Sequence, residues 1–132
     1  MIYLRSLLYL IAMAVATVGF GLTVALTGRI LSWERRSAIS NAWGTTNLWL
    51  LRVICGLRYR LTGWENIPQT PCIVMAKHQS AWETMALRGL LPCGQSWILK
   101  RELLRVPVFG WALASMEPIA IDRSAGSTAI KQ

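Results

Sequence analysis

The chain has 132 residues, of which 54% are apolar, and its 14 basic against 6 acidic side chains give a net charge of +8. This length allows one domain and a membrane segment, but no large second core. The cysteines Cys55, Cys72 and Cys93 form no Cys-x-x-Cys pair, and the sequence holds a single histidine. This pattern excludes a disulfide framework and the usual zinc-binding spacings, so we expect reduced thiols and no metal site.

The first predicted element is an apolar helix over residues 6–28, a run without a charged side chain. At about 1.5 Å per residue such a helix reaches roughly 35 Å, enough to cross a hydrocarbon core of about 30 Å. We therefore expect a transmembrane helix here. A cleaved signal peptide is the alternative, because residues 14–16 have the Ala-x-Ala form, although apolar sequence continues beyond them.

Basic side chains crowd the region that follows this helix, with few acidic ones between them: Arg29, Arg35, Arg36, Arg52, Arg58 and Arg60. No nucleic-acid-binding motif accompanies them, so nucleic acid is not expected as a partner. An anionic lipid leaflet is the simpler partner, at about 1 kcal/mol per basic residue near its surface. A merely solvated charged face is the alternative. More arginines follow the helix than precede it, which predicts that the remainder of the chain lies in the cytoplasm.

A second helical pattern runs from about residue 38 to residue 57. Its shared face is made of Ile39, Trp43, Thr46, Leu50, Ile54 and Leu57. Tryptophans favour membrane interfaces, so an amphipathic helix in the headgroup region is one interpretation. A plain core helix is the other. A second membrane span is disfavoured, because Arg52 would lie within it.

From residue 57 onward, short apolar runs alternate with helical stretches. We expect strands at 57–62, 72–76, 96–99 and 118–121, and helices at 82–91, at 107–116 and from residue 126. Strands separated by helices predict an α/β fold with a mixed or parallel sheet flanked by helices. We therefore divide the chain into membrane anchor and interfacial helices at 1–56 and the first part of an α/β domain at 57–132.

The only histidine, His78, lies where the strand predicted at 72–76 hands over to the helix predicted at 82–91. On one continuous helix, His78 and Glu83 would lie about 140° apart and would not meet. Across a strand-to-helix turn, the carboxylate can orient the imidazole and stabilise it when it takes a proton. The alternative is structural, because Ser80 and Glu83 also fit a capping box that only closes the helix start.

Three ordered blocks carry a resemblance to a known family: residues 78–83 (His-Gln-Ser-Ala-Trp-Glu), residues 100–103 (Lys-Arg-Glu-Leu) running into 107–110 (Pro-Val-Phe-Gly), and residues 117–123 (Glu-Pro-Ile-Ala-Ile-Asp-Arg). Together they resemble the glycerolipid acyltransferases, most closely the bacterial 1-acyl-glycerol-3-phosphate acyltransferases, from about Leu57 to the end. Glu83 stands where the family more often has Asp. Later family blocks do not follow, so we expect the amino-terminal part of a longer enzyme, inactive by itself.

The resemblance implies that His78 is the general base and that Glu83 orients it. It assigns Arg123 to the substrate phosphate, with Lys100 and Arg101 as weaker candidates, and it implies no cofactor. The expected reaction transfers an acyl group from acyl-CoA or acyl carrier protein to the sn-2 hydroxyl of lysophosphatidate, giving phosphatidic acid. No Gly-x-Ser-x-Gly element is present to supply a serine nucleophile.

The expected location is the inner membrane, with the catalytic part facing the cytoplasm. Two alternatives stay open at this point. One is an acyltransferase that acts on another lysophospholipid or lipid acceptor. The other is a non-enzymatic, basic, membrane-anchored lipid-binding protein, which explains residues 6–60 equally well but gives no reason for the turn that holds His78 and Glu83.

Overall fold

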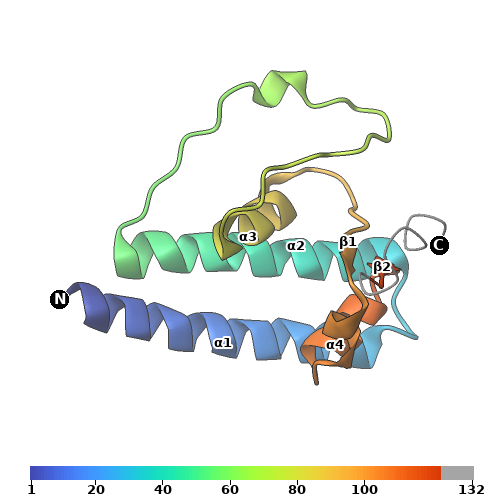
Figure 1. The fold of residues 1–132 in the computed structure, drawn as a ribbon, viewed down its shortest axis with the longest axis horizontal. Coiled ribbons are helices and arrows are strands. Elements are labelled where there is room, and N and C mark those ends of the chain that lie inside the picture. Colours follow the sequence, from blue (N-terminus) through green and yellow to red (C-terminus); the bar gives the residue numbers. More distant parts are fainter. Residues whose placement is uncertain (123–132) are drawn as a thin grey trace.

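Two long helices lie side by side and run antiparallel, and the rest of the described chain packs on them (Figure 1). Helix α1 spans Ile2–Thr27, and helix α2 spans Trp33–Leu50. The computed structural model describes residues 1–122. The predicted phosphate ligand Arg123 and the helix predicted from residue 126 lie outside the described residues.

Helix α1 confirms the helix predicted over residues 6–28 and extends it toward the N-terminus. Leucine and alanine, both strong helix formers, are its most frequent residues. Thr17, Thr23 and Thr27 donate their hydroxyls to carbonyls four residues earlier, which satisfies these polar groups within the helix. Among the described residues, α1 is the one helix long and apolar enough to cross a membrane, judged by length and composition. Most of its large apolar side chains are exposed.

Helix α2 lies between α1 and helix α3, which spans Ala81–Leu90. On the α1 side, Trp43 Nε1 donates to Thr17 Oγ1 at 3.1 Å. Asn47 is fully buried, and its amide donates to the carbonyl of Trp43 at 2.8 Å. Packing on two sides favours the core interpretation of residues 38–57 over a helix that lies free in the headgroup region. After Leu50 the chain continues as a π-helical turn, Leu51–Cys55.

Two glycines let α2 and α3 approach closely. A Cβ atom built on Gly44 would lie 2.5 Å from the backbone nitrogen of Gly89 and 2.7 Å from the carbonyl oxygen of Met85. A Cβ on Gly89 would lie 2.6 Å from the backbone nitrogen of Thr45. Since backbone atoms cannot move aside as a side chain can, the two helices cross at this distance only because both positions lack a side chain.

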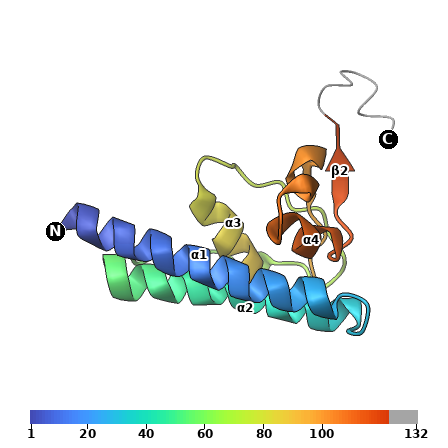
Figure 2. The same cartoon turned by 90° about the horizontal axis from the view of Figure 1, so that it is seen from below.

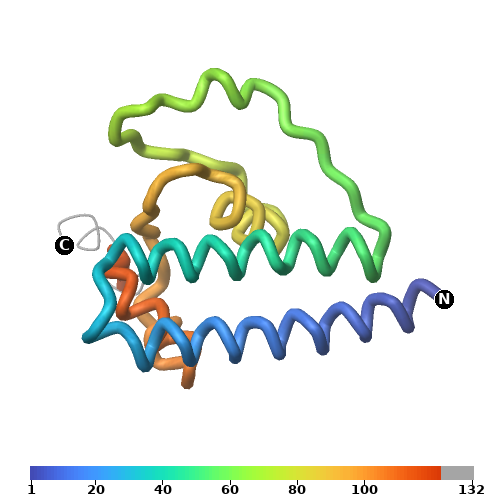
Figure 3. Tube along the Cα trace, turned by 180° about the vertical axis from the view of Figure 1, so that it is seen from behind, coloured from blue at the N-terminus to red at the C-terminus, as the bar shows by residue number. Residues whose placement is uncertain are grey.

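Residues 57–79 form a long excursion over α3, which we call the arch (Figures 1 and 3). Its only helical element is the 3₁₀ turn Trp64–Asn66. The strands predicted at 57–62 and 72–76 were therefore wrong for the described structure. Ile73 and Met75 are 90% and 92% exposed, so this run is not buried either. A strand needs a partner for its backbone groups, and among residues 1–122 neither segment has one.

The sheet of the described region has two parallel strands, β1 at Ile98–Lys100 and β2 at Ile119–Ile121. Ile98 lies opposite Ile119, and Lys100 lies opposite Ile121. The 3₁₀ turn Arg101–Arg105 and helix α4, at Phe109–Ala114, connect them. Two of the four predicted strands and the parallel arrangement are confirmed, and α4 is shorter than the helix predicted at 107–116. Helix α4 packs on α1 at one end of the helix pair (Figure 2).

Candidate active site at the start of α3

The start of α3 is closed by a capping box, as the structural alternative predicted. Ser80 has extended backbone angles, and its hydroxyl oxygen accepts from the backbone N–H of Trp82 at 3.2 Å. In return, the backbone N–H and the hydroxyl of Ser80 both donate to Glu83 Oε2, each at 2.8 Å. The backbone N–H of Gln79 donates to Glu83 Oε1 at 3.4 Å. The Glu83 carboxylate is therefore fixed by several donors.

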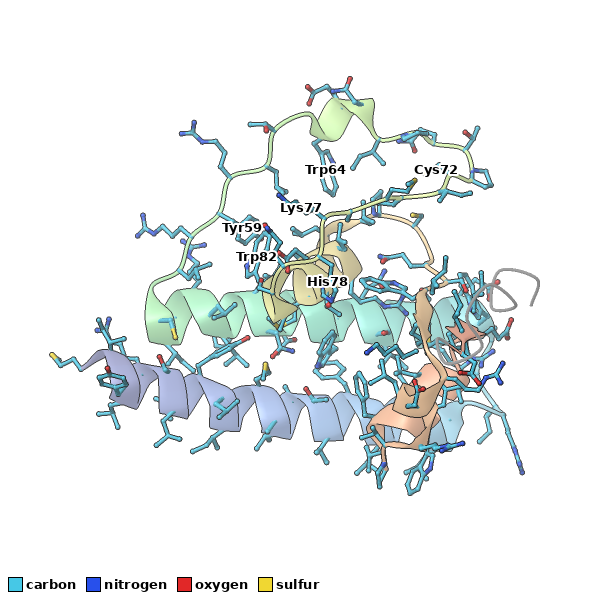
Figure 4. The ribbon with its side chains drawn as sticks, viewed as in Figure 1. Tyr59, Trp64, Cys72, Lys77, His78 and Trp82 are labelled. Carbon is cyan, nitrogen blue, oxygen red and sulfur yellow. The ribbon has the colours of Figure 1, made fainter. Side chains whose placement is uncertain are left out.

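His78 lies directly before this cap, at the end of the arch (Figure 4). Its Nδ1 atom is 3.9 Å from Glu83 Oε2, the same oxygen that accepts from Ser80. This distance is longer than a hydrogen bond of about 2.7–3.2 Å, so the two groups are neighbours without being bonded. The His78 side chain is 70% exposed, against 23% for Glu83. The capping box and the His78–Glu83 pair are thus compatible, because one carboxylate oxygen faces both partners.

The electrostatic state of Glu83 follows from its hydrogen bonds. The backbone N–H of Glu83 itself, and next the Ser80 hydroxyl, hold the pKa of the Glu83 carboxyl below its usual range. The carboxyl is consequently ionised at neutral pH. Glu83 therefore places a fixed negative charge 3.9 Å from the exposed imidazole of His78.

An apolar groove of about 170 Å³ lies beside this pair, between the arch and α3. The side chains that line it are almost all hydrocarbon or aromatic: Leu61, Trp64, Ala76, Trp82, Glu83, Ala86, Leu87, Leu90 and Leu91. Glu83 is the one charged residue of this lining. The groove thus offers space for an apolar group beside the hydrocarbon part of the Glu83 side chain.

The cationic candidates lie at the carboxyl ends of the two strands. Lys100 is the last residue of β1, and Arg101 opens the 3₁₀ turn that follows it. Arg101 forms an ion pair with Asp122, which directly follows β2, at 3.8 Å. Arg123 is the next residue along the chain. Arg101 therefore lies beside Asp122, the residue before Arg123 in the sequence. None of the contacts described for Arg101 is with His78 or Glu83.

Arg88 is a buried residue that sequence reasoning missed. It is 5% exposed, its Nε donates to Ser40 Oγ at 2.8 Å, and its guanidinium donates to the carbonyl of Gln95 at 2.9 Å. Burial lowers the pKa of Arg88 to about 10. Gln95 in turn donates to the carbonyl of Leu87 and accepts from Trp97 Nε1. This network ties the end of α3 to α2 and to the segment that enters β1.

One signal in the sequence could have indicated this role. Arg88 follows Met85 by three residues, so both lie on the same face of the helix predicted at 82–91. An arginine on an apolar helix face predicts a buried polar network. Within residues 1–122, no group of three or more histidine, cysteine or acidic side chains is arranged to hold a metal ion.

The chain also matches a known protein family. A family model described as "Acyltransferase" matches residues 58–132, more than half of the chain. A Pseudomonas aeruginosa protein named "1-acyl-sn-glycerol-3-phosphate acyltransferase" is 43% identical over 131 residues, which cover 98% of this chain and 50% of that protein. A Saccharomyces cerevisiae protein of the same name is 29% identical over 130 residues, covering 97% of this chain and 41% of that protein.

A third relative, "1-acyl-sn-glycerol-3-phosphate acyltransferase BAT2, chloroplastic" from Brassica napus, is 36% identical over 67 residues, covering 48% of this chain and 19% of that protein. The chain spans half or less of the length of each of these relatives. No solved structure matches the chain.

Proposed function

Since the chain belongs to the acyltransferase family, we propose that it carries the catalytic base of a 1-acyl-sn-glycerol-3-phosphate acyltransferase. The acyl donor is acyl-CoA or acyl carrier protein. The acceptor is the sn-2 hydroxyl of lysophosphatidate, and the product is phosphatidic acid. The names of the relatives that match nearly the whole chain support this choice of substrate.

His78 acts as the base in this proposal. Its imidazole takes the proton of the acceptor hydroxyl while the oxygen attacks the thioester carbonyl. A carbon–oxygen bond forms, the carbon–sulfur bond breaks, and the imidazolium returns the proton to the leaving thiolate. Glu83 fixes the ring orientation and stabilises the imidazolium between the two proton transfers. No covalent acyl-enzyme and no cofactor take part.

The observation that carries this proposal is the pairing of an exposed His78 with a firmly held Glu83. The Nδ1–Oε2 separation of 3.9 Å closes to a hydrogen bond by a small movement of the histidine, because the carboxylate is already positioned by the Ser80 cap. The hydrogen bond between two catalytic residues is often long or poorly aligned before the substrate binds. The adjacent apolar groove fits part of an acyl chain.

We assign the acceptor phosphate to Arg123, with Arg101 and Lys100 as secondary cations. Guanidinium groups match phosphate oxygens in pairs, whereas an ammonium acts as a point charge. The position of Arg101 at the edge that precedes Arg123 supports a shared anion site there. We further propose that α1 attaches the enzyme to the cytoplasmic membrane and that the His78–Glu83 pair faces the cytoplasm, where both acyl donors occur.

The test is His78→Ala in the full-length enzyme, assayed by thioester release with lysophosphatidate as acceptor. Loss of a general base typically lowers the rate by about 10²- to 10⁴-fold. Gln79→Ala is the matched control, because Gln79 is an exposed neighbour that donates its backbone N–H to Glu83, a hydrogen bond that survives the substitution. A His78→Ala enzyme with nearly the wild-type rate would remove His78 from the mechanism.

A further inference from the structure

A second groove, of about 420 Å³, lies at the end of α2, where the arch begins. Arg52 and Arg58 line it together with Trp49, Leu57 and Tyr59, and we call it the cationic groove. Its volume is in the range of pockets that hold small ligands. It shares no lining residue with the apolar groove beside Glu83.

The backbone explains why these side chains meet. The π-helical turn Leu51–Cys55 ends at Gly56, which has a φ of 73° that favours glycine. The N–H of Gly56 donates to the carbonyl of Arg52 at 3.1 Å, and the N–H of Leu57 donates to that of Leu51 at 3.3 Å. The chain therefore folds back at the end of α2. Single π turns of this kind often occur at functional sites.

The groove carries positive charge and therefore favours an anionic ligand. Arg52 and Arg58 are both exposed, and no acidic residue belongs to the lining. Within residues 1–122, neither guanidinium forms an ion pair. Two guanidinium forks at one concave surface suit the oxygens of a phosphate ester.

The aromatic side chains and the neighbouring helix favour a lipid as the source of that phosphate. Trp49 and Tyr59 are 59% and 43% exposed, and both residue types concentrate where a bilayer meets water. The π-helical turn packs on α1, and Cys55 Sγ lies 3.8 Å from the carbonyl oxygen of Arg5 in the first turns of that helix. The turn that precedes the groove thus also contacts α1, whose large apolar side chains are mostly exposed.

We propose that the cationic groove binds the phosphate headgroup of an anionic phospholipid within the bilayer. The lining of this groove includes none of the residues assigned to the acceptor phosphate. One contact links it to the candidate active site: the Tyr59 ring meets the Trp82 ring edge-on, with centroids 5.8 Å apart, and Trp82 precedes Glu83 (Figure 4). A lipid in the groove therefore holds the start of the arch against α3 at the bilayer surface.

The test is flotation of the full-length enzyme with vesicles of phosphatidylcholine alone or of phosphatidylcholine mixed with phosphatidylglycerol. The wild-type chain is expected to prefer the anionic vesicles, through the two arginines. Arg52→Ala and Arg58→Ala are each expected to lower this preference about fivefold. Because both side chains contact one phosphate, the double variant loses less than the product of the single losses.

Arg60→Ala is the matched control, since Arg60 is exposed in the same stretch but does not line the groove. Two results would show a diffuse basic surface and overturn the proposal. One is that Arg60→Ala lowers the preference for anionic vesicles as much as Arg52→Ala does. The other is that the loss in the double variant of Arg52 and Arg58 equals the product of the two single losses. Displacement of the chain by free glycerol phosphate would also overturn it. His78→Ala is expected to keep the lipid preference, so this outcome is separable from failure of the proposed acyl transfer.

Discussion

The helices and the arch differ in how their residues are held. Helices α1, α2 and α3 pack through two facing glycines, a buried asparagine and the Arg88 network. The arch, residues 57–79, has no strand pairing among the described residues, and its apolar side chains at 73–75 are exposed. The candidate base His78 belongs to the arch, whereas its partner Glu83 belongs to α3. A carboxylate held by hydrogen bonds thus lies next to an exposed histidine.

In the proposed mechanism, this difference in exposure and hydrogen bonding has a chemical use. A base that must approach an acceptor hydroxyl and then a leaving thiolate benefits from an exposed side chain, while the charge that stabilises its protonated form must be in place beforehand. The Ser80 cap supplies that fixed position, because it holds Glu83 by two hydrogen bonds of 2.8 Å.

Substitution of two methionines, one in α3 and one in the arch, tests the difference in packing most sharply and has the largest expected effect on stability. Met85 is 4% exposed on α3, and Met75 is 92% exposed in the arch. Met85→Ala is expected to lower the free energy of unfolding by about 2–5 kcal/mol, the usual cost of a cavity at a buried methionine. Met75→Ala should change it by less than about 0.5 kcal/mol. Equal effects in denaturant titrations would show that the arch is as tightly packed as the helices.

Substitution of two glycines, one between α2 and α3 and one in α1, is expected to change stability in opposite directions. Gly44→Ala places a Cβ against the backbone of α3 and is expected to cost about 1–3 kcal/mol of unfolding free energy. Gly19→Ala, in α1, meets nothing within 4 Å and should stabilise by about 0.5–1 kcal/mol. Thermal unfolding in detergent measures both. A neutral Gly44→Ala would mean that α2 and α3 do not cross at this point.

The cap at the start of α3 predicts a smaller effect with a pH signature. Ser80→Ala is expected to cost about 0.5–2 kcal/mol. The folded-state pKa of Glu83 is lowered, so its contribution is present above the unfolded pKa and is lost as the pH falls through the folded value. Without the Ser80 hydroxyl, the pKa of Glu83 is lowered less, so the free energy of unfolding should fall less in acid than it does in the wild-type protein. Unfolding curves with the same acid dependence in both proteins would contradict the role of the cap.

The sequence predicted those parts of the fold that depend on local patterns. The apolar run of α1 and the capping box at Ser80 and Glu83 follow local patterns, because propensity and capping act over a few residues. The strands predicted at 96–99 and 118–121 correspond to β1 at 98–100 and β2 at 119–121. The strands predicted at 57–62 and 72–76 were wrong, since strand formation depends on a partner that no local pattern reveals.

Tertiary contacts also changed the interpretation of charge. The arginines at 29, 35 and 36 lie at one end of the α1–α2 pair, and the antiparallel return of α2 brings the turn that contains Arg52 against the first turns of α1, near Arg5. Both ends of the pair therefore carry arginines. The order of these charges along the chain does not reveal the cationic groove, because the groove depends on the π-helical turn and on Gly56.

The central claim is that Glu83 acts on His78 and does not only cap α3, and Glu83→Gln in the full-length enzyme tests it most directly. Glutamine also completes a capping box, so the substitution keeps the helix start while removing the charge. We expect a fall in the acylation rate of about tenfold or more, smaller than the loss in His78→Ala, while the variant keeps the helix start and loses at neutral pH only the acid-sensitive stability that the ionised carboxylate contributes. A Glu83→Gln enzyme that keeps the wild-type rate would show that Glu83 is a cap alone and would contradict the account.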